Sequence, residues 1–397
     1  MRASKQIKAI FLAIVGFSAM AGPCRAGVYS SIDADVEVDQ FSRNFDVFGK
    51  VLLDLQAVAF PEGGPNPPIR QRYVLLEKLF AKQGPANLSI EQKLNLSTVL
   101  IRRGKVDEAI DLLKPLSEDN PDNFVIMSQL ATAQFLGTPE QRANALDYMK
   151  EALSKWPEKW TDLNEDQAKF LRSIHWEETR LAKFRSYDKY LERLIRHRLA
   201  EDNKRKKKEA VKDAVDPIFG DDKALVSFVN DKGEFEVGRI MHPDLQRLPQ
   251  DADVVAQQLL LWMPHDERLL WLLGEVLNAR ASSDTKKRSE AIRNAGLVFK
   301  RLDDIAFNRS GMYGRKDIKE RYDAINQYVK DLPPNPIDPR LQNIIDKAKD
   351  EEEGSLLENK IFWRALIVGV VTGVAVGMFA LWQIQEMRRR RQANQPT

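Results

Sequence analysis

The sequence predicts a mainly α-helical protein: a solenoid of α-α hairpins, interrupted by a long helix and a small β-hairpin, with one C-terminal transmembrane helix. Three observations predict this architecture. Apolar residues recur at helical spacing in units of about 35 residues, each closed by a proline. An uncharged run occupies residues 365–382, and a basic and then apolar stretch opens the chain.

Composition excludes several classes of protein. The 397 residues are 43% hydrophobic, which is too apolar for a disordered polymer. The net charge is +3, but the positive excess lies in residues 1–26 and 361–397, so the remainder is mildly acidic and unsuited to bulk polyanion binding. Cys24 is the only cysteine, which excludes a disulfide framework and a zinc–thiolate site in the body of the protein.

The first 26 residues have the pattern of a secretory signal peptide. Arg2, Lys5 and Lys8 form a basic start, and the apolar stretch that follows is too short to span a bilayer. Small residues allow cleavage after Ala21 or after Ala26. We therefore expect the body of the protein to lie outside the cytoplasm.

Residues 361–385 are predicted to form a transmembrane helix. The uncharged run 365–382 spans about 27 Å as a helix, close to the thickness of the hydrocarbon core. Trp363 and Trp382 flank it, as expected at the two membrane interfaces. The arginines at 388–391 follow directly, so the positive-inside rule places the C-terminus in the cytoplasm and argues against a buried core helix.

Small residues form a stripe along this predicted span. The stripe consists of Ala365, Gly369, Gly373 and Gly377. In lipid, such a stripe lets two helix backbones approach closely, which predicts homo-oligomerisation or pairing with another membrane helix. The alternative is that glycine is simply common in membrane helices.

One stretch of the chain repeats with a recognisable pattern. After a first apolar helix that contains Leu96, Gly104 marks a turn, and the run Asp107–Ile110 with Leu113 leads to Pro121. This stretch resembles a tetratricopeptide (TPR) repeat of 34 residues. It departs from the family at Lys93, where a large apolar residue is usual, and at Ser97, where glycine or alanine is usual.

Two further stretches resemble the same repeat. The next unit follows directly, with Ala131 in its first helix, Ala145 in its second and Pro157 at its end. In a third stretch, Ala252, Ala256, Leu259 and Pro264 have the spacing of a second repeat helix. The pattern Leu270-x-x-Leu273-Gly274-x-x-Leu277 then matches a first helix, and a partner helix follows it. One helix pair cannot bury its apolar face alone, so the units must stack, with helices near 69–83 and 317–330 as caps.

These patterns divide the chain into nine predicted regions. A long charged helix is expected from Asn164 to about Lys208, and a hairpin around Asn230–Gly233. The regions are a signal peptide (1–26), an N-terminal extended region (27–65), TPR-like helices (66–158), the long charged helix (159–216), a β-hairpin insertion (217–250), a second TPR-like block (251–330), a Pro-rich linker with an acidic juxtamembrane helix (331–360), the transmembrane helix (361–385) and a basic tail (386–397).

The sequence contains no pattern typical of an active site. His175 and Glu178 share a helix face, but no further ligand completes a metal site at the right spacing. We therefore predict no catalytic residue, no metal and no cofactor. The basic run Lys204–Lys208 is interpreted as the solvated end of the long helix, and contact with anionic lipid headgroups or an acidic partner is the alternative.

The resemblance to TPR proteins implies a scaffold that binds protein or peptide partners. In that family the first helix of each pair lines a groove. By position, the groove residues are Asn95, Thr98, Arg102, Gln129, Thr132, Arg268, Trp271 and Glu275. The alternative function is a structural membrane oligomer held together by the glycine stripe, without a dedicated groove.

Similarity to bacterial envelope proteins and the lack of other cysteines favour a bacterial inner membrane, with the repeats in the periplasm. A eukaryotic type I membrane protein is the alternative.

Overall fold

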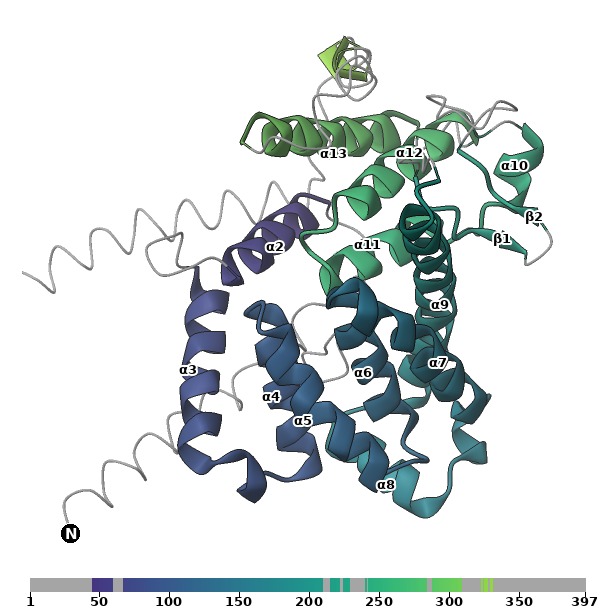
Figure 1. Cartoon of the computed structure of the whole chain (residues 1–397). Coiled ribbons are helices and arrows are strands. Elements are labelled where there is room, and N and C mark those ends of the chain that lie inside the picture. The colour runs from purple at the N-terminus through teal and green to yellow at the C-terminus, as the bar shows by residue number, and fades with distance from the viewer. Residues whose placement is uncertain are drawn as a thin grey trace, which may run out of the picture. The chain divides into compact units, whose positions relative to one another are not determined.

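The computed structural model describes residues 45–59, 67–209, 215–221, 224–228, 240, 242–283, 288–308, 323, 325–327 and 329–330 (Figure 1). The chain divides into two compact units, residues 1–332 and 333–397, and all described residues belong to the first. The predicted signal peptide, linker, transmembrane helix, glycine stripe and basic tail lie outside the described residues. Among the residues that are described, no helix has the length and hydropathy needed to cross a membrane.

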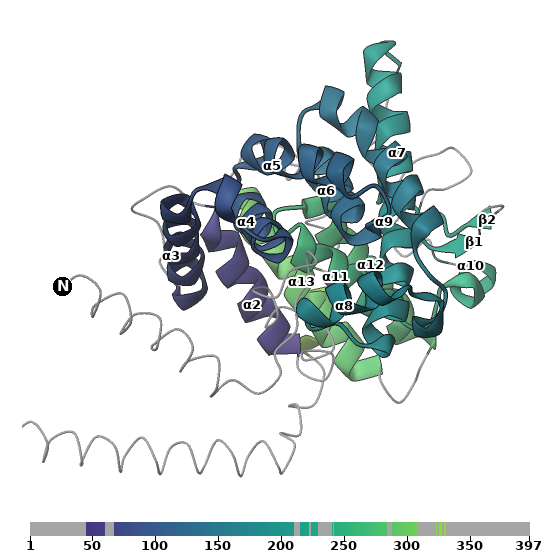
Figure 2. The same ribbon diagram turned by 90° about the horizontal axis from the view of Figure 1, so that it is seen from below.

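Three helix pairs follow one another in the N-terminal half of the described chain. They are α2 (Phe45–Val58) with α3 (Pro68–Gln83), α4 (Ile90–Arg102) with α5 (Val106–Asp119), and α6 (Phe124–Leu136) with α7 (Pro139–Lys155). Each helix packs against the next. Figure 2 shows α3 to α7 following one another in an arc, with α11 on its inner side. The prediction of paired helices between residues 66 and 158 is confirmed.

Local sequence sets the ends of these helices. Ser89 before α4 and Thr138 before α7 each form a capping box, with Gln92 and Gln141 respectively. The turn between α4 and α5 needs a left-handed backbone, which Gly104 supplies at a φ of 73°. A short 3₁₀ turn at Pro85–Asn87 joins α3 to α4. These boundaries are encoded within a few residues of each terminus.

The extended region predicted for residues 27–65 is wrong at Phe45–Val58, because α2 is a helix of 14 residues there. Phe48, Leu52 and Leu55 lie at helical spacing, and all three are buried. Burial of this apolar stripe against α3 and α11 stabilises the helix in the folded chain.

The long helix predicted from Asn164 to about Lys208 is also wrong as a single element. The structure has the 3₁₀ turn Trp160–Asp162, then α8 (Glu165–Ser173) and α9 (Glu178–Lys206). His175 lies between the two helices and has a φ of 61°. The Trp176 amide donates back to the Leu171 carbonyl at 2.8 Å, so α8 ends in a left-handed turn and Trp176 packs into the core.

The described part of the predicted insertion contains a two-stranded sheet upstream of the predicted turn. Strand β1 (Gly220–Asp221) pairs antiparallel with β2 (Ala224–Leu225), with Gly220 opposite Leu225. A Cβ at Gly220 would lie 2.5 Å from the Ala224 carbonyl oxygen, so only glycine allows this pairing. The predicted turn at 230–233 lies outside the described residues. A short helix, α10 (His242–Arg247), follows.

The helices predicted for the second block are confirmed among its described residues, which form α11 (Ala252–Trp262), α12 (Glu267–Ser283) and α13 (Arg288–Asn308). Gly274 allows α12 and α13 to pack closely, because a Cβ there would lie 2.7 Å from the Phe299 ring. Residues 323, 325–327 and 329–330 are helical, and Ile325 and Val329 lie beside Gly296 of α13. The predicted cap at residues 317–330 is described only at these positions.

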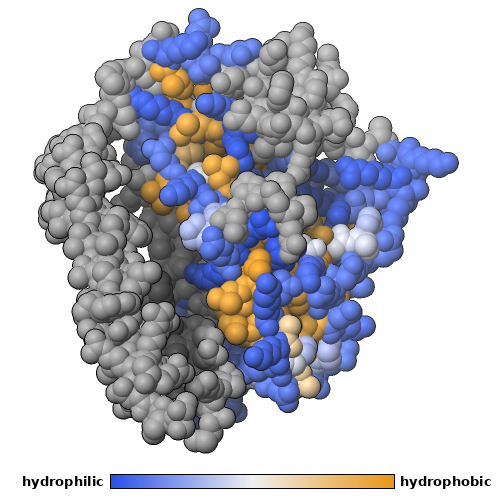
Figure 3. All heavy atoms as spheres, turned by 90° about the vertical axis from the view of Figure 1, so that its left-hand side faces the viewer, coloured by the Kyte–Doolittle hydropathy of each residue, from blue (hydrophilic) through white to orange (hydrophobic). Residues whose placement is uncertain are grey.

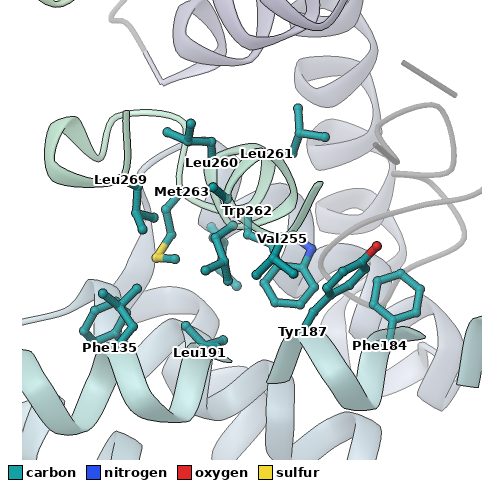
Figure 4. Close-up of a cluster of buried hydrophobic side chains, with 14 of the residues drawn as sticks. Phe135, Phe184, Tyr187, Leu191, Val255, Leu260, Leu261, Trp262, Met263 and Leu269 are labelled. Carbon is teal, nitrogen blue, oxygen red and sulfur yellow. The ribbon is translucent and has the colours of Figure 1, made fainter. Parts of the chain in front are cut away.

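One apolar core joins the two helical blocks. Trp262 of α11 stacks on Phe184 of α9 with ring centroids 6.1 Å apart, and Tyr187 meets the same indole edge-on. Figure 4 shows α11 side chains facing Phe135 of α6 and Leu191 of α9. Trp262, Phe184, Tyr187, Phe135 and Leu191 are each at least 95% buried. The inner side of the first block is therefore covered by the second.

Candidate functional site: the inner side of the helical repeats

The predicted groove residues lie on α4, α6 and α12, the helices to which the TPR resemblance assigned them. They are not exposed. Asn95 is 6% exposed, and Thr98, Gln129 and Thr132 are each 2% exposed or less. A residue that contacts a partner must be accessible before the partner arrives, so burial bears directly on the prediction.

Polar contacts between α4 and α6 occupy the side chain of Gln129. Its Nε2 donates to the Leu94 carbonyl at 3.0 Å, to the Ser97 hydroxyl at 2.7 Å and to the Thr98 hydroxyl at 2.9 Å. Ser97 in turn donates to the Leu94 carbonyl at 2.8 Å. The departure from the family pattern at Ser97 thus provides an acceptor for Gln129. This amide holds two repeats together instead of facing a ligand.

Arg102 of α4 reaches across to the end of α11. Its Nη1 donates to the main-chain oxygens of Leu261 and Trp262, the latter at 3.2 Å. These oxygens belong to the last turn of α11, where carbonyls lack partners within the helix. The guanidinium therefore caps α11, and its positive charge complements the negative end of the helix dipole.

The turn after α11 is also held by α2. Gln56 Nε2 donates to the Pro264 carbonyl at 2.6 Å, and Arg301 of α13 donates to the side-chain oxygen of Gln56. Gln56 is only 8% exposed. One buried amide thus connects α2, the α11–α12 turn and α13.

A buried hydroxyl links α6 to α9. Ser128 donates to a carboxylate oxygen of Asp188, and both residues are fully buried. Thr132 of α6 donates back to the Ser128 carbonyl at 3.0 Å, so its hydroxyl is also used within the fold.

Ionic contacts gather where α9 meets the α11–α12 turn. We call this group the α9 ionic cluster, and it consists of His197, Arg198, Glu201, Asp216, Asp266 and Arg268. Arg198 lies 2.8 Å from Asp216 and also pairs with Asp266. Arg268 lies 2.6 Å from Glu201 and 2.8 Å from Asp216. Asp216 is fully buried and contacts both arginines.

Protonation equilibria in the cluster follow from these pairs. Burial alone would raise the pKa of Glu201, but interactions with His197 and Arg268 outweigh burial and lower this pKa to about 2. Burial also opposes ionisation of Asp266, yet Arg198 and the Leu269 amide lower its pKa. Glu201 and Asp266 are therefore ionised at neutral pH. Asp266 also caps α12 by accepting from the Leu269 amide at 3.0 Å, as expected of an aspartate in this turn.

The predicted groove residues on α12 are likewise buried or paired within the chain. Arg268, predicted to line the groove, pairs with a carboxylate of its own chain, Glu201, and its side chain is 11% exposed. Trp271 and Glu275 are each 1% exposed. The expectation that these eight residues line an accessible groove is therefore corrected, because α11 contacts α4 and α12, α9 contacts α6, and α13 packs against α12. Their role in binding a partner is a separate prediction that the structure does not test.

Sequence reasoning missed five members of the cluster: His197, Arg198, Glu201, Asp216 and Asp266. No local pattern marks them, because Arg198 and Asp266 are 68 residues apart. Among the described residues, no group of three or more His, Cys, Asp or Glu side chains is arranged to hold a metal ion.

Exposed apolar side chains mark another surface, at the N-terminal end of the helix series. Among the described residues, the large exposed apolar side chains include Val47 (39% exposed) and Leu53 (44%) on α2, and Leu75 (52%) on α3. Figure 3, which views this side of the molecule, shows apolar areas among hydrophilic side chains. We call these three residues the α2–α3 apolar surface.

Comparison with known proteins supports the repeat. The chain is 33% identical over 85 residues to a TPR repeat-containing protein of Pseudomonas aeruginosa. The match covers 21% of this chain and 14% of the relative, so the chain spans only a small part of that protein. No protein-family model matches the chain, and no solved structure matches it. The described helix pairs fit TPR-like repeats, and the distant relative suggests a helical repeat domain, an architecture suited to protein–protein interaction.

Proposed function

We propose that this protein is a non-enzymatic scaffold, anchored in a bacterial inner membrane by residues 361–385, whose helical repeats bind protein partners in the periplasm. The observation that carries the proposal is the series of stacked helix pairs from α2 to α7, together with the similarity to a TPR repeat-containing protein. Repeats of this kind expose long surfaces that suit extended contacts with other chains.

The α2–α3 apolar surface is the part of the repeats best suited to receive a partner. Val47, Leu53 and Leu75 lie on two helices that contact each other, and their apolar side chains gain free energy when a partner removes them from water. The inner side is already filled by the protein's own α9 and α11. A partner that binds the repeats therefore approaches from outside.

Site-specific photo-crosslinking in cells tests this proposal. A photoreactive residue is placed at Leu53 or Leu75, and matched controls carry it at Lys150 on α7 and Leu297 on α13, both of which are exposed. We expect one protein species to be captured from both positions 53 and 75 and from neither control. Capture from all four positions alike, or from none, would contradict a partner site on this surface.

The same crosslinking experiment distinguishes a scaffold that binds other proteins from a structural membrane oligomer. If the captured species is a second copy of this chain and Gly373→Ile abolishes the capture, assembly through the membrane helix is the better explanation. Anchoring itself is tested by alkaline extraction of membranes: a chain that spans the bilayer stays in the pellet, and one that does not is released.

A further inference from the structure

A run of basic residues ends helix α9 and has no role in the contacts described above. It comprises Lys204, Arg205, Lys206, Lys207 and Lys208, and all five are exposed. We call it the α9 basic end. Helix α9 is 29 residues long, and its last turn carries three of these five residues.

Acidic residues one turn earlier leave most of this charge uncompensated. Glu201 and Asp202 are each 7% exposed. Glu201 forms an ion pair with Arg268 at 2.6 Å, and Asp202 forms one with Arg142 at 2.7 Å. Arg205 contributes longer contacts to the same two carboxylates, at 3.9 Å and 3.5 Å. Glu201 and Asp202 of α9 are thus neutralised from other helices. Glu140 of α7 interacts with Lys206, and Glu209 directly follows Lys208, so five basic residues face two further acids and the run keeps a net positive charge.

The helix dipole explains only part of the run. Basic residues stabilise the last turn of a helix, but the effect fades beyond that turn. Lys207 and Lys208 lie past the end of α9. Lys208 adopts a φ of 59°, a left-handed conformation that glycine or asparagine takes at lower cost. A lysine at this position therefore makes the fold less stable than glycine would. Its positive charge points to a role outside the fold.

We propose that the α9 basic end binds the anionic headgroups of a lipid bilayer. Four of the five residues are lysines, which act as point charges rather than as the forked donors that suit a specific phosphate or carboxylate. Residues 203–209 contain no aromatic side chain on which a nucleic-acid base can stack, and no apolar side chain that can insert into lipid. The α9 basic end therefore offers positive charge without stacking or inserting side chains, which suits the spread negative charge of an anionic lipid surface.

The proposed membrane anchor in the same chain strengthens this choice. Tethering to a bilayer keeps the surface at a high effective concentration, so that weak electrostatic contacts are occupied. In this respect the inference depends on the proposed function. Each lysine near an anionic surface contributes roughly a fivefold gain in partition, so four together contribute about two to three orders of magnitude.

The test uses the full chain in nanodiscs, made of phosphatidylcholine alone or with phosphatidylglycerol. Amide hydrogen exchange is measured for residues 203–209. We expect exchange about tenfold slower in the anionic discs, and the difference to vanish at high salt. The variant K204Q/K206Q/K207Q/K208Q, which keeps Arg205 and its ion pairs, removes the protection. The matched variant K78Q/K82Q/K114Q/K150Q changes four other exposed lysines and retains it.

Three outcomes overturn the inference. They are equal exchange in both discs, equal protection in both four-lysine variants, and protection by soluble heparin in phosphatidylcholine discs without protection by phosphatidylglycerol. The last outcome assigns the α9 basic end to a polyanionic macromolecule. A chain that copurifies with neither disc contradicts the membrane anchor instead. Sedimentation with anionic vesicles, with and without the four lysines, then decides the lipid contact independently.

Discussion

The guanidinium of Arg102 donates a hydrogen bond to the main-chain oxygen of Trp262 at 3.2 Å, although 160 residues separate the two. Arg102 lies on an inner repeat helix, where the TPR resemblance expects contact with a ligand. In this protein the end of α11 takes that place. The helical repeats thus bind a segment of their own chain, and this contact shapes what each substitution below is expected to do.

Replacement of Arg102 by Met should destabilise the fold. The substitution removes charged hydrogen bonds to two carbonyls and leaves them buried without a donor, which costs about 2–3 kcal/mol. The free energy of unfolding in denaturant measures this loss. Lys114→Met, at an exposed position on α5, is the control and should change stability by less than about 0.5 kcal/mol. Equal stability of the two variants would show that the cap of α11 contributes little.

A methyl group at Gly274 should push α12 away from α13. The added Cβ would lie 2.7 Å and 2.9 Å from ring atoms of Phe299, and overpacking of this kind costs about 1–3 kcal/mol. Gly49→Ala in α2 is the matched control, because its Cβ meets no atom within 4 Å. Alanine there should stabilise the helix by about 0.5–1 kcal/mol. Thermal unfolding of both variants measures the two shifts, and a stable Gly274→Ala protein would contradict close packing.

Glycine in place of His175 should stabilise the protein by about 0.5–1 kcal/mol, since the residue is exposed and has a φ of 61°. Relief of the left-handed strain exceeds the added entropy of the unfolded chain. Arg172→Gly, three residues earlier within α8, should instead cost about 1 kcal/mol. The difference in denaturation midpoint between the variants checks the break between α8 and α9; a loss of stability in both would argue for continuous helix.

Acid should weaken the α9 ionic cluster. The pKa of Glu201 is lowered from its ordinary 4.5 to about 2, so the folded state holds fewer protons on this carboxyl than the unfolded state does in that range. The contribution of Glu201 to stability is complete above pH 4.5 and is lost as the pH falls towards 2. The free energy of unfolding should therefore decrease with falling pH across this window.

Arg268→Met identifies the source of this pH dependence. Without the guanidinium the pKa of Glu201 rises towards its ordinary value, so the variant is less stable at neutral pH and its stability depends less on pH between 4.5 and 2. Glu108→Gln, at an exposed carboxylate of α5, should leave the pH profile unchanged. An unaltered slope in the Arg268 variant would place the titration elsewhere.

Much of the helical architecture was predictable because its determinants are local. Capping boxes at Ser89 and Thr138, the turn at Gly104 and the prolines that close each pair all lie within a few residues of the boundaries they set. Helix α2 was missed although Phe48, Leu52 and Leu55 have helical spacing, so a pattern was present. The break at His175 was missed because histidine, although enriched among the few non-glycine residues with positive φ, adopts that conformation too rarely for one histidine to mark the end of a helix.

The sequence by itself determined the paired helices and their order, since apolar period and capping act over one or two turns of chain. Only the tertiary structure decided that the inner side is filled. The partners that bury Gln129, Arg102 and Arg268 lie 35, 160 and 67 residues away, and no local pattern specifies such pairs. Burial depends on which surfaces meet after the helices have formed, because apolar surface gains free energy against any complementary face, from its own chain or another.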